Sequence, residues 1–235
     1  MKGIILAGGI GSRLYPLTKV TNKHLLPIGS FPMIHYPIIS MTNAGIKDIM
    51  IISGTGHVGD MIDFLGSGNE YDCNFTFKVQ DKPDGIAGAL KLCKHFVGGD
   101  NCLVILGDNI FDRDLSKDVK EFNYDAKLFF KKVSDPERFG VAVLNKENKL
   151  IKIEEKPKKP KSDLACMGIY MYNSRVFDCL NKIKKSPRGE YEITTLNNYI
   201  LRKYITEYTT LDGFCVDAGT MESYHATSRL MYEQE

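Results

Sequence analysis

A glycine-rich loop and two basic side chains stand near the start of the chain. Leu6-Ala7-Gly8-Gly9-Ile10-Gly11-Ser12-Arg13 ends an apolar run, and Lys23 follows a little later. Glycines allow backbone N–H groups to approach phosphate oxygens. Two cations beside such a loop would offset the charge of a polyphosphate during its transfer. The glycines alone would also suit a tight turn, so the prediction of a phosphate site depends on Arg13 and Lys23.

This loop differs from two common phosphate-binding motifs. No Gly-Lys-Ser/Thr follows it, so it is not a Walker A loop, and Leu14 stands where the dinucleotide fingerprint has its last glycine. The sequence therefore disfavours a nicotinamide-dependent oxidoreductase.

Two aspartates follow apolar runs. Asp108 ends Val104-Ile105-Leu106-Gly107-Asp108, and Asp217 ends a run that leads into Ala218-Gly219 and a predicted helix. A carboxylate at the ligand edge of a sheet is a usual way to hold Mg²⁺ against a substrate phosphate. We predict that Asp108 and Asp217 form such a site, although Asp108 could instead cap a helix.

The segments that position these residues predict an α/β fold. Strand-like runs at 2–7, 48–53, 74–80 and 102–106 alternate with helical patterns at 32–44, 59–65 and 85–96, with Pro32 expected in the first turn of its helix. Ligands of such doubly wound sheets gather at the carboxyl ends of the strands. We therefore expect a Rossmann-like, mixed but mostly parallel sheet flanked by helices.

The second half has a different pattern of elements. Strands are expected at 126–133, 140–144, 150–155 and 165–172, and helices at 174–184, 193–204 and 221–233. No linker or repeat divides the chain, so we predict a single domain over 1–235 with halves at 1–125 and 126–235. The basic, proline-containing run at 156–161 is either a solvated turn or a loop that gathers anions.

Composition and charge limit the possible partners. The 235 residues include 31 Lys and Arg against 29 Asp and Glu, a formal charge of +2 that indicates neither a nucleic-acid nor a membrane partner. No apolar run has the length of a signal peptide or spanning helix, so we expect a cytoplasmic protein. The six scattered cysteines are expected to be buried apolar side chains rather than metal ligands or disulfides.

Seven motifs in order give the chain a resemblance to the sugar-nucleotide nucleotidyltransferases, and in particular to the branch that joins dTTP to glucose 1-phosphate. They are the loop through Arg13-Leu14-Tyr15-Pro16 with Lys23-His24-Leu25-Leu26-Pro27, and then Gln80-Asp81-Lys82-Pro83-Asp84-Gly85, Leu106-Gly107-Asp108-Asn109, Arg138-Phe139-Gly140-Val141, Glu154-Glu155-Lys156-Pro157, Arg188-Gly189-Glu190 and Asp217-Ala218-Gly219-Thr220. The resemblance implies a sugar phosphate attacking the α-phosphorus of dTTP, with dTDP-glucose and pyrophosphate as products and Mg²⁺ as cofactor. It also implies a homo-oligomer.

The resemblance also implies roles for individual residues. Arg13, Lys23 and Asp108 would be catalytic, and Asp108 and Asp217 would hold the metal. The nucleotide would be bound in the first half of the chain, by Leu6, Ala7, Gly8, Gly9, Gly11, Gln80, Pro83, Gly85 and Gly107. The hexose 1-phosphate would be bound chiefly by the second half, through Asn109, Gly140, Glu155, Lys156 and Arg188.

Gln80 matches the position that reads the pyrimidine. Its side-chain amide offers an N–H donor and a carbonyl acceptor, which complement the carbonyl and N–H groups of thymine or uracil. The same amide does not separate dTTP from UTP, so a UTP-using enzyme, or one that uses another hexose phosphate, remains an alternative. A polar strand-end residue that faces water would also explain Gln80.

Some residues depart from the family pattern. Gly88 stands where relatives have Gln, Phe214-Cys215 where they have tryptophan, and Cys166-Met167-Gly168 in place of Val-Thr-Gly. These changes leave open which hexose 1-phosphate the protein uses. A non-catalytic sugar-nucleotide sensor is a further alternative. Such a protein would be expected to lose a cation or a carboxylate of the site, whereas this chain keeps Arg13, Lys23, Asp108 and Asp217. The chain ends at Glu235, before the extension that the long form carries, so we expect its regulatory site to be absent or rebuilt.

Overall fold

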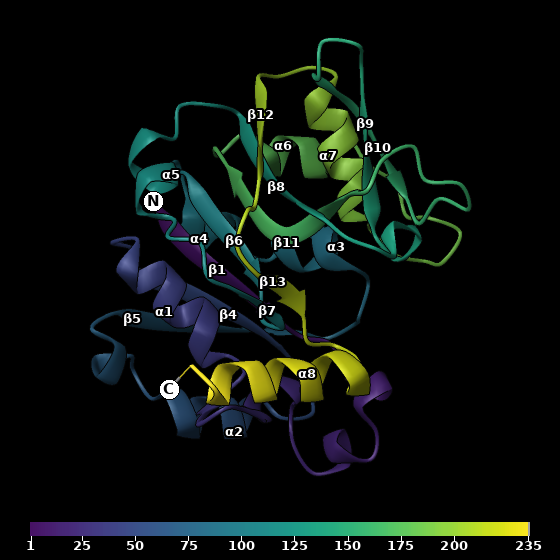
Figure 1. Cartoon of the computed structure of the whole chain (residues 1–235). Helices are drawn as coiled ribbons and strands as arrows, with labels where there is room; N and C mark the ends of the chain where they lie inside the picture. Colours follow the sequence, from purple (N-terminus) through teal and green to yellow (C-terminus); the bar gives the residue numbers. More distant parts are fainter. Residues whose placement is uncertain (235) are drawn as a thin grey trace.

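The computed structural model describes residues 1–234 and has a mixed nine-stranded sheet with helices on both faces (Figure 1). The strand order is β10-β9-β11-β6-β1-β4-β5, and β8 joins β11 to β12. These strands are β1 (Lys2–Ala7), β4 (Asp48–Gly54), β5 (Asn74–Gln80), β6 (Cys102–Leu106), β8 (Ala126–Lys132), β9 (Gly140–Leu144), β10 (Leu150–Glu155), β11 (Leu164–Tyr172) and β12 (Thr206–Thr210).

Eight α-helices accompany the sheet in the described part of the chain. They are α1 (His35–Asn43), α2 (Val58–Leu65), α3 (Ile86–Lys91), α4 (Lys94–Val97), α5 (Ser116–Glu121), α6 (Val176–Leu180), α7 (Ile193–Leu201) and α8 (Met221–Tyr232). None of the helices within residues 1–234 is long and apolar enough to cross a membrane.

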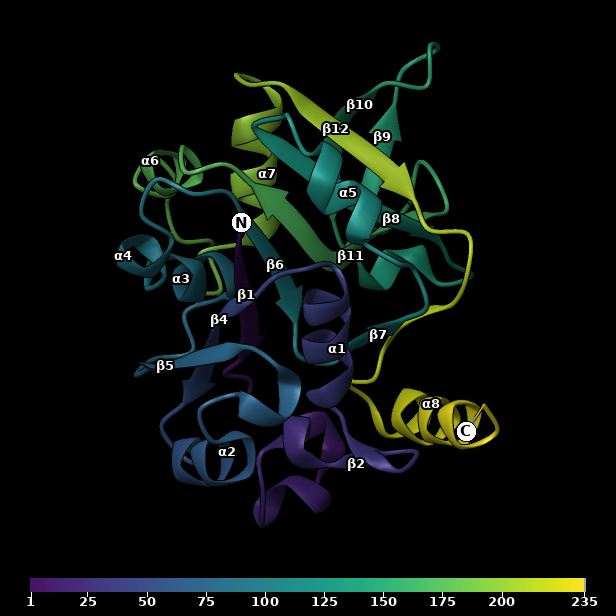
Figure 2. The same ribbon diagram turned by 90° about the vertical axis from the view of Figure 1, so that its left-hand side faces the viewer.

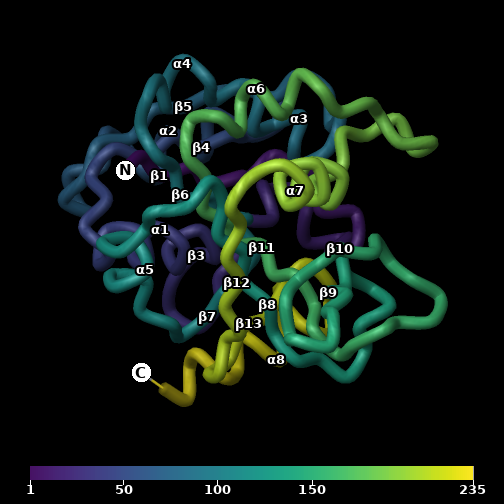
Figure 3. Tube along the Cα trace, turned by 90° about the horizontal axis from the view of Figure 1, so that it is seen from above, coloured from purple at the N-terminus to yellow at the C-terminus, as the bar shows by residue number. Residues whose placement is uncertain are grey.

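The central strand β1 is apolar on both faces because both faces are covered. Ile4 and Leu6 belong to the core beneath α3, α4, α6 and α7, whereas Ile5 and Ala7 belong to the core shared with α1, α2 and α5. Side chains alternate across a strand, so a continuous apolar run fills both cores at once. Figures 2 and 3 show these two helical layers on either side of the sheet.

The sheet changes direction between its halves. β6, β1, β4 and β5 run parallel, whereas β11 pairs antiparallel with β6, β8 and β9. The later strands therefore extend the same sheet, and the mixed α/β architecture is as expected. All six cysteines are free, and all except the half-buried Cys166 are buried.

Two expected helices differ in the structure. Pro32 lies in the hairpin of β2 (Pro27–Ile28) and β3 (Phe31–Pro32), and α1 begins only at His35, with Pro37 in the first turn, where a missing N–H is tolerated. The expected helix at 85–96 is two helices, because the N–H groups of Leu92 and Cys93 bond to carbonyls three residues back. The helices expected at 174–184 and 193–204 are also shorter in the structure, where they are α6 (Val176–Leu180) and α7 (Ile193–Leu201).

Candidate functional site

A small ribbon beside the main sheet brings the two predicted aspartates together. β7 (Asn109–Phe111) pairs antiparallel with β13 (Cys215–Asp217), and Asn109 lies opposite Asp217. The Ala218 N–H also donates to the Asp108 carbonyl, 2.9 Å away. The backbone of this ribbon therefore fixes the separation of Asp108 from Asp217.

Three charged side chains approach Gly219 so closely that a larger residue there would collide with them. A Cβ atom on Gly219 would lie 2.6 Å from Asp217 Oδ1, 3.0 Å from Arg13 Nη2 and 3.2 Å from Asp108 Oδ2. The helix that follows is anchored by a reciprocal pair of hydrogen bonds between Thr220 and Ser223. The two carboxylates thus converge on one point, with a guanidinium beside them.

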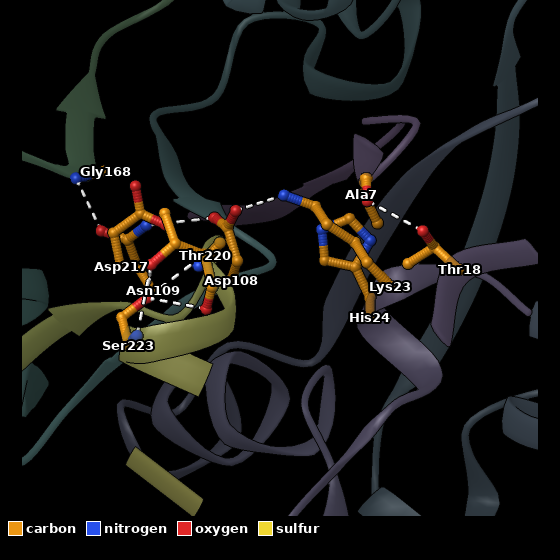
Figure 4. A network of polar contacts seen from close by, with 12 residues as sticks. Ala7, Thr18, Lys23, His24, Asp108, Asn109, Gly168, Asp217, Thr220 and Ser223 are labelled. Carbon is orange, nitrogen blue, oxygen red and sulfur yellow. Dashed lines mark hydrogen bonds and ion pairs between the residues drawn. The ribbon is translucent and has the colours of Figure 1, made fainter. Parts of the chain in front are cut away.

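The carboxylates differ in their electrostatics. Burial alone would raise the pKa of Asp108, but the Lys23 ammonium, His24 and hydrogen bonds from Lys23 and Asn109 hold this pKa well below its usual range. Lys23 Nζ makes an ion pair with Asp108 Oδ2, as Figure 4 shows. Burial, together with the charge of Asp108, raises the pKa of Asp217, against smaller opposing effects of Lys23, Arg13 and the Gly219 N–H.

This geometry suits a divalent cation. Mg²⁺ takes oxygen ligands and is usually bound through one or two carboxylates together with substrate phosphates. Within residues 1–234 no cluster of three or more His, Cys, Asp or Glu is placed to hold a metal. Asp108 and Asp217 could therefore supply the protein's share of such a site, and a cation between them would remove their mutual repulsion.

Asn22 is a site residue that the sequence analysis missed. Its Oδ1 accepts from the His24 N–H at 2.9 Å and lies 2.7 Å from His24 Nδ1, while its Nδ2 donates to the Ala7 carbonyl at 3.4 Å. It therefore joins the end of β1 to the turn that carries Lys23. The Asn-x-x pattern before a short helix was the available signal.

Gly107 is needed for the packing of His24. A Cβ atom at Gly107 would lie 2.6 Å from His24 Cδ2. Gly107 is expected to bind nucleotide, and in the structure the position that a side chain would take there lies against this buried ring.

The glycine loop lies over Lys23. A Cβ atom on Gly9 would lie 3.3 Å from Lys23 Cε, and one on Gly11 would lie 2.8 Å from Thr18 Cγ2. Gly11 has a φ of 71°, and Thr18 Oγ1 donates to its carbonyl at 2.8 Å. Gly11 therefore shapes the loop through its backbone conformation, which favours glycine.

Two adjoining hollows flank Arg13 and Asp217. One of about 350 Å³ lies over the glycine loop and the end of β5, and we name it the nucleotide hollow after the residues of its lining that the sequence analysis expects to bind nucleotide. It is lined by Leu6, Gly8, Gly9, Arg13, Lys23, Gln80, Pro83, Gly85, Ile86, Ala89, Leu106, Asp108, Glu190 and Asp217. Of the expected nucleotide-binding residues, Ala7, Gly11 and Gly107 are not part of this lining.

The second hollow has about 210 Å³, and we name it the sugar hollow after the residues of its lining that the sequence analysis expects to bind the hexose phosphate. It is lined by Arg13, Ile86, Leu106, Asn109, Arg138, Phe139, Gly140, Glu155, Lys156, Cys166, Met167, Gly168, Tyr170, Ile193, Thr194 and Asp217. Arg13, Asp217, Ile86 and Leu106 line both hollows. Arg13 and Asp217 therefore stand on the boundary between them.

The polar groups of the sugar hollow are tied to one another. Thr194 Oγ1 donates to Glu155 Oε2 at 2.5 Å, and Arg188 Nη2 lies 3.8 Å from Glu155 Oε1. Arg188 itself, half exposed, is held by Glu192 through three hydrogen bonds. Arg188 is therefore near the hollow but turned toward acidic partners.

Asn109 connects the two sides of the site. Its Nδ2 donates to Asp108 Oδ1 at 3.2 Å, and its Oδ1 accepts from the Gly168 N–H at 2.9 Å. A Cβ atom at Gly168 would lie 2.8 Å from that same Oδ1. Of the departures from the family pattern, Cys166 and Met167 line the sugar hollow, whereas Cys215 is buried in the core.

Comparison with known proteins agrees with this geometry. Residues 2–234 match the nucleotidyl transferase family model, and the chain belongs to that family. A glucose-1-phosphate thymidylyltransferase of Neisseria meningitidis is 41% identical over 231 residues, which are 96% of this chain and 80% of that protein. The crystal structure of a candidate glucose-1-phosphate thymidylyltransferase of Bacillus anthracis, in complex with sucrose, is 52% identical with a TM-score of 0.93, covering 99% of this chain and 96% of that one.

A more distant structure shares the fold. A UDP-glucose pyrophosphorylase complexed with UDP-glucose is 23% identical with a TM-score of 0.85, and covers 100% of this chain and 99% of its own. The family and the α/β fold expected from the sequence motifs are therefore confirmed, and the chain is a nucleotidyltransferase.

The buried His24 predicts a pH dependence of stability. Burial, with a smaller effect of Lys23, lowers the pKa of His24 from 6.5 to about 3 although Asp108 opposes this shift. The unfolded chain therefore binds the proton more readily, so this stabilisation is complete above about pH 6.5 and is lost as the pH falls toward about 3. In His24→Gln, we expect the slope of unfolding free energy between about pH 4 and 6 to fall by up to about 1.4 kcal/mol per pH unit. Urea titrations at stepped pH measure it, and equal slopes would contradict the buried neutral ring.

Gly219 predicts a steric effect on transfer. Gly219→Ala places a methyl group between Arg13, Asp108 and Asp217, and we expect nucleotidyl transfer to fall by about 10²-fold, because misplacement by about 1 Å has effects of that size. The matched control is Gly99→Ala, since a Cβ atom there has nothing within 4 Å. Pyrophosphate release measures both variants. Equal activities in the two variants would show that the close approach of these groups to Gly219 is not needed for transfer.

Proposed function

We propose that this nucleotidyltransferase joins dTTP to glucose 1-phosphate and releases dTDP-glucose and pyrophosphate. The observation that carries the proposal is the boundary between the two hollows, where Arg13 and Asp217 would face both substrates. Relatives named for this activity, with the identities given above, support the choice of substrates.

The reaction is an in-line displacement at phosphorus. A phosphate oxygen of glucose 1-phosphate forms a bond to the α-phosphorus of dTTP, and the bond from that phosphorus to the pyrophosphate oxygen breaks. Such a reaction needs alignment of the reactants and neutralisation of charge more than it needs a proton-transfer base. The side chains of this site are suited to those two tasks.

Arg13 and Lys23 would act on the charge of the transferring phosphates. The Arg13 guanidinium lies beside both carboxylates and can form paired hydrogen bonds to phosphate oxygens. Lys23, now paired with Asp108, would lie under the glycine loop and the phosphates above it. Asp108 and Asp217 would hold Mg²⁺, which when bound supplies further charge neutralisation on the triphosphate.

Each half of the chain would bind one of the two substrates. The nucleotide hollow is lined mainly by residues before 125, and Gln80 there would read the pyrimidine. The sugar hollow is lined mainly by later residues. Lys156 and Arg188 would bind the sugar phosphate, Glu155 would accept hydrogen bonds from sugar hydroxyls, and Gly140 and Asn109 would contact the sugar. We propose one domain on this basis, with a nucleotide-binding and a sugar-binding half.

The test is an assay of four triphosphates, dTTP, UTP, dCTP and dATP, against several hexose 1-phosphates, with pyrophosphate release as the readout and EDTA as the metal control. The highest kcat/KM is expected for dTTP with glucose 1-phosphate in the presence of Mg²⁺. A clear preference for UTP would change the nucleotide assignment. The methyl group that distinguishes thymine from uracil contributes only about 1–3 kcal/mol, so dTTP and UTP have to be compared directly. A preference for another hexose would change the sugar assignment, and no release with any pair would reject the function.

Arg13→Ala should lower kcat by about 10²- to 10³-fold with a smaller change in KM, because the guanidinium acts mainly on charge that develops during transfer. Steady-state kinetics with dTTP measure the split. Arg202→Ala, at an exposed position at the end of α7, is the matched control. A wild-type kcat in Arg13→Ala would remove this residue from the mechanism.

A further inference from the structure

The Gln80 amide is fixed in one orientation by its neighbours. Gln80 Nε2 donates to Asp84 Oδ1 at 3.1 Å and lies 3.5 Å from the Gly85 carbonyl oxygen. Carboxylate and carbonyl oxygens only accept hydrogen bonds, so the NH₂ group must face them. Oε1 therefore points the other way, to within 2.9 Å of the position of a Cβ atom on Gly8.

Asp84 reaches this position because residue 88 is glycine. A Cβ atom at Gly88 would lie 2.2 Å from Asp84 Oδ1, so any side chain there would displace the carboxylate. The Tyr191 N–H donates to the Asp84 carbonyl at 2.7 Å, and Lys185 Nζ lies 3.6 Å from Asp84 Oδ2. Gly88, one of the departures from the family pattern, thus makes room for the group that holds Gln80.

We propose that Asp84 is a positioning residue that sets base specificity by fixing the orientation of the Gln80 amide. This inference depends on the proposed function, in which Gln80 reads the pyrimidine. The fixed amide presents Oε1 as an acceptor to the N3–H of thymine or uracil, while the two N–H groups of Nε2 face Asp84 and the Gly85 carbonyl. The site thereby selects a pyrimidine that carries a proton on N3.

Cytosine has the opposite pattern, with a bare N3 and an amino group beside it. Gln80 could match cytosine only by turning its amide over, which would aim Oε1 at the Asp84 carboxylate. Two acceptors would then face each other in a half-buried site, and an unpaired polar group in such a place is strongly disfavoured. The rejection of cytosine therefore originates in Asp84, although Asp84 need not touch the base.

The main test is Asp84→Asn, measured as the ratio of kcat/KM for dTTP over dCTP. Asparagine has nearly the same shape, but its amide can donate or accept, so Gln80 becomes free to turn. We expect the ratio to fall by about tenfold or more. A general loss of structure would lower both activities together and leave the ratio unchanged.

Two other variants sharpen the test. Gly88→Ala keeps Asp84 but excludes its carboxylate from the observed position, so the ratio should fall in the same direction. Lys185→Gln is the matched control, because it removes the ion pair to Asp84 and leaves the hydrogen bond to Gln80, so the ratio should stay within about twofold of wild type. A wild-type ratio in Asp84→Asn would overturn the proposal.

Equilibrium binding of dTTP and dCTP separates this inference from the proposed reaction. A wild-type protein that binds dTTP in preference to dCTP, but transfers to no hexose phosphate, would reject the reaction and leave the role of Asp84 standing. A wild-type protein that binds both equally would overturn the role of Asp84, whatever its activity.

Discussion

The repulsion between two carboxylates that converge on one point is the constraint on which the rest of the site depends. Burial makes each charge harder to hold, and the charge of Asp108 raises the pKa of Asp217. Lys23 offsets the charge of Asp108, while Arg13 lies beside Asp217. Because these two cations are shared between the carboxylates and the proposed phosphates, the same groups that stabilise the paired carboxylates also prepare the site for a charged substrate.

Small residues decide how closely these groups can approach. Gly219 allows the two carboxylates and Arg13 to come close to its backbone. Gly107 makes room for the His24 ring, and Gly168 makes room for the Asn109 amide. Each of these glycines is required by a specific neighbour in the structure. In the sequence alone, a glycine indicates a turn. In the structure these three glycines matter because they have no side chain, which allows residues far away in the sequence to pack against them.

The parts of the site that the sequence predicts are those with local causes. Asp108 and Asp217 each follow an apolar run, and that pattern places a carboxylate at the edge of a sheet. Asn22 was missed because its importance depends on its contact with Ala7, which only the folded chain brings close, whereas its bonds to His24 are local. Ala7, Gly11 and Gly107 do not line the nucleotide hollow. A sequence motif does not show which of its residues line a cavity, and the role of these three in nucleotide binding stays a prediction.

The fold shows the same division. The buried parallel strands are plain in the sequence, but β12 is not, because Thr206–Thr210 is polar and only half buried and owes its conformation to pairing with β8. Pro32 suits a helix start by type, yet the pairing of β2 with β3 places it in a hairpin. In both cases a partner strand outweighs the local preference.

The β7–β13 ribbon has a consequence for biosynthesis. β13 is the last strand of the described chain, so every strand of the main sheet is made before Asp217 emerges from the ribosome. Until then Asp108 has its ammonium partner but no second acid, and the nascent polypeptide cannot assemble the paired carboxylates. Catalytic competence would therefore require that β13 has been made and has docked beside β7.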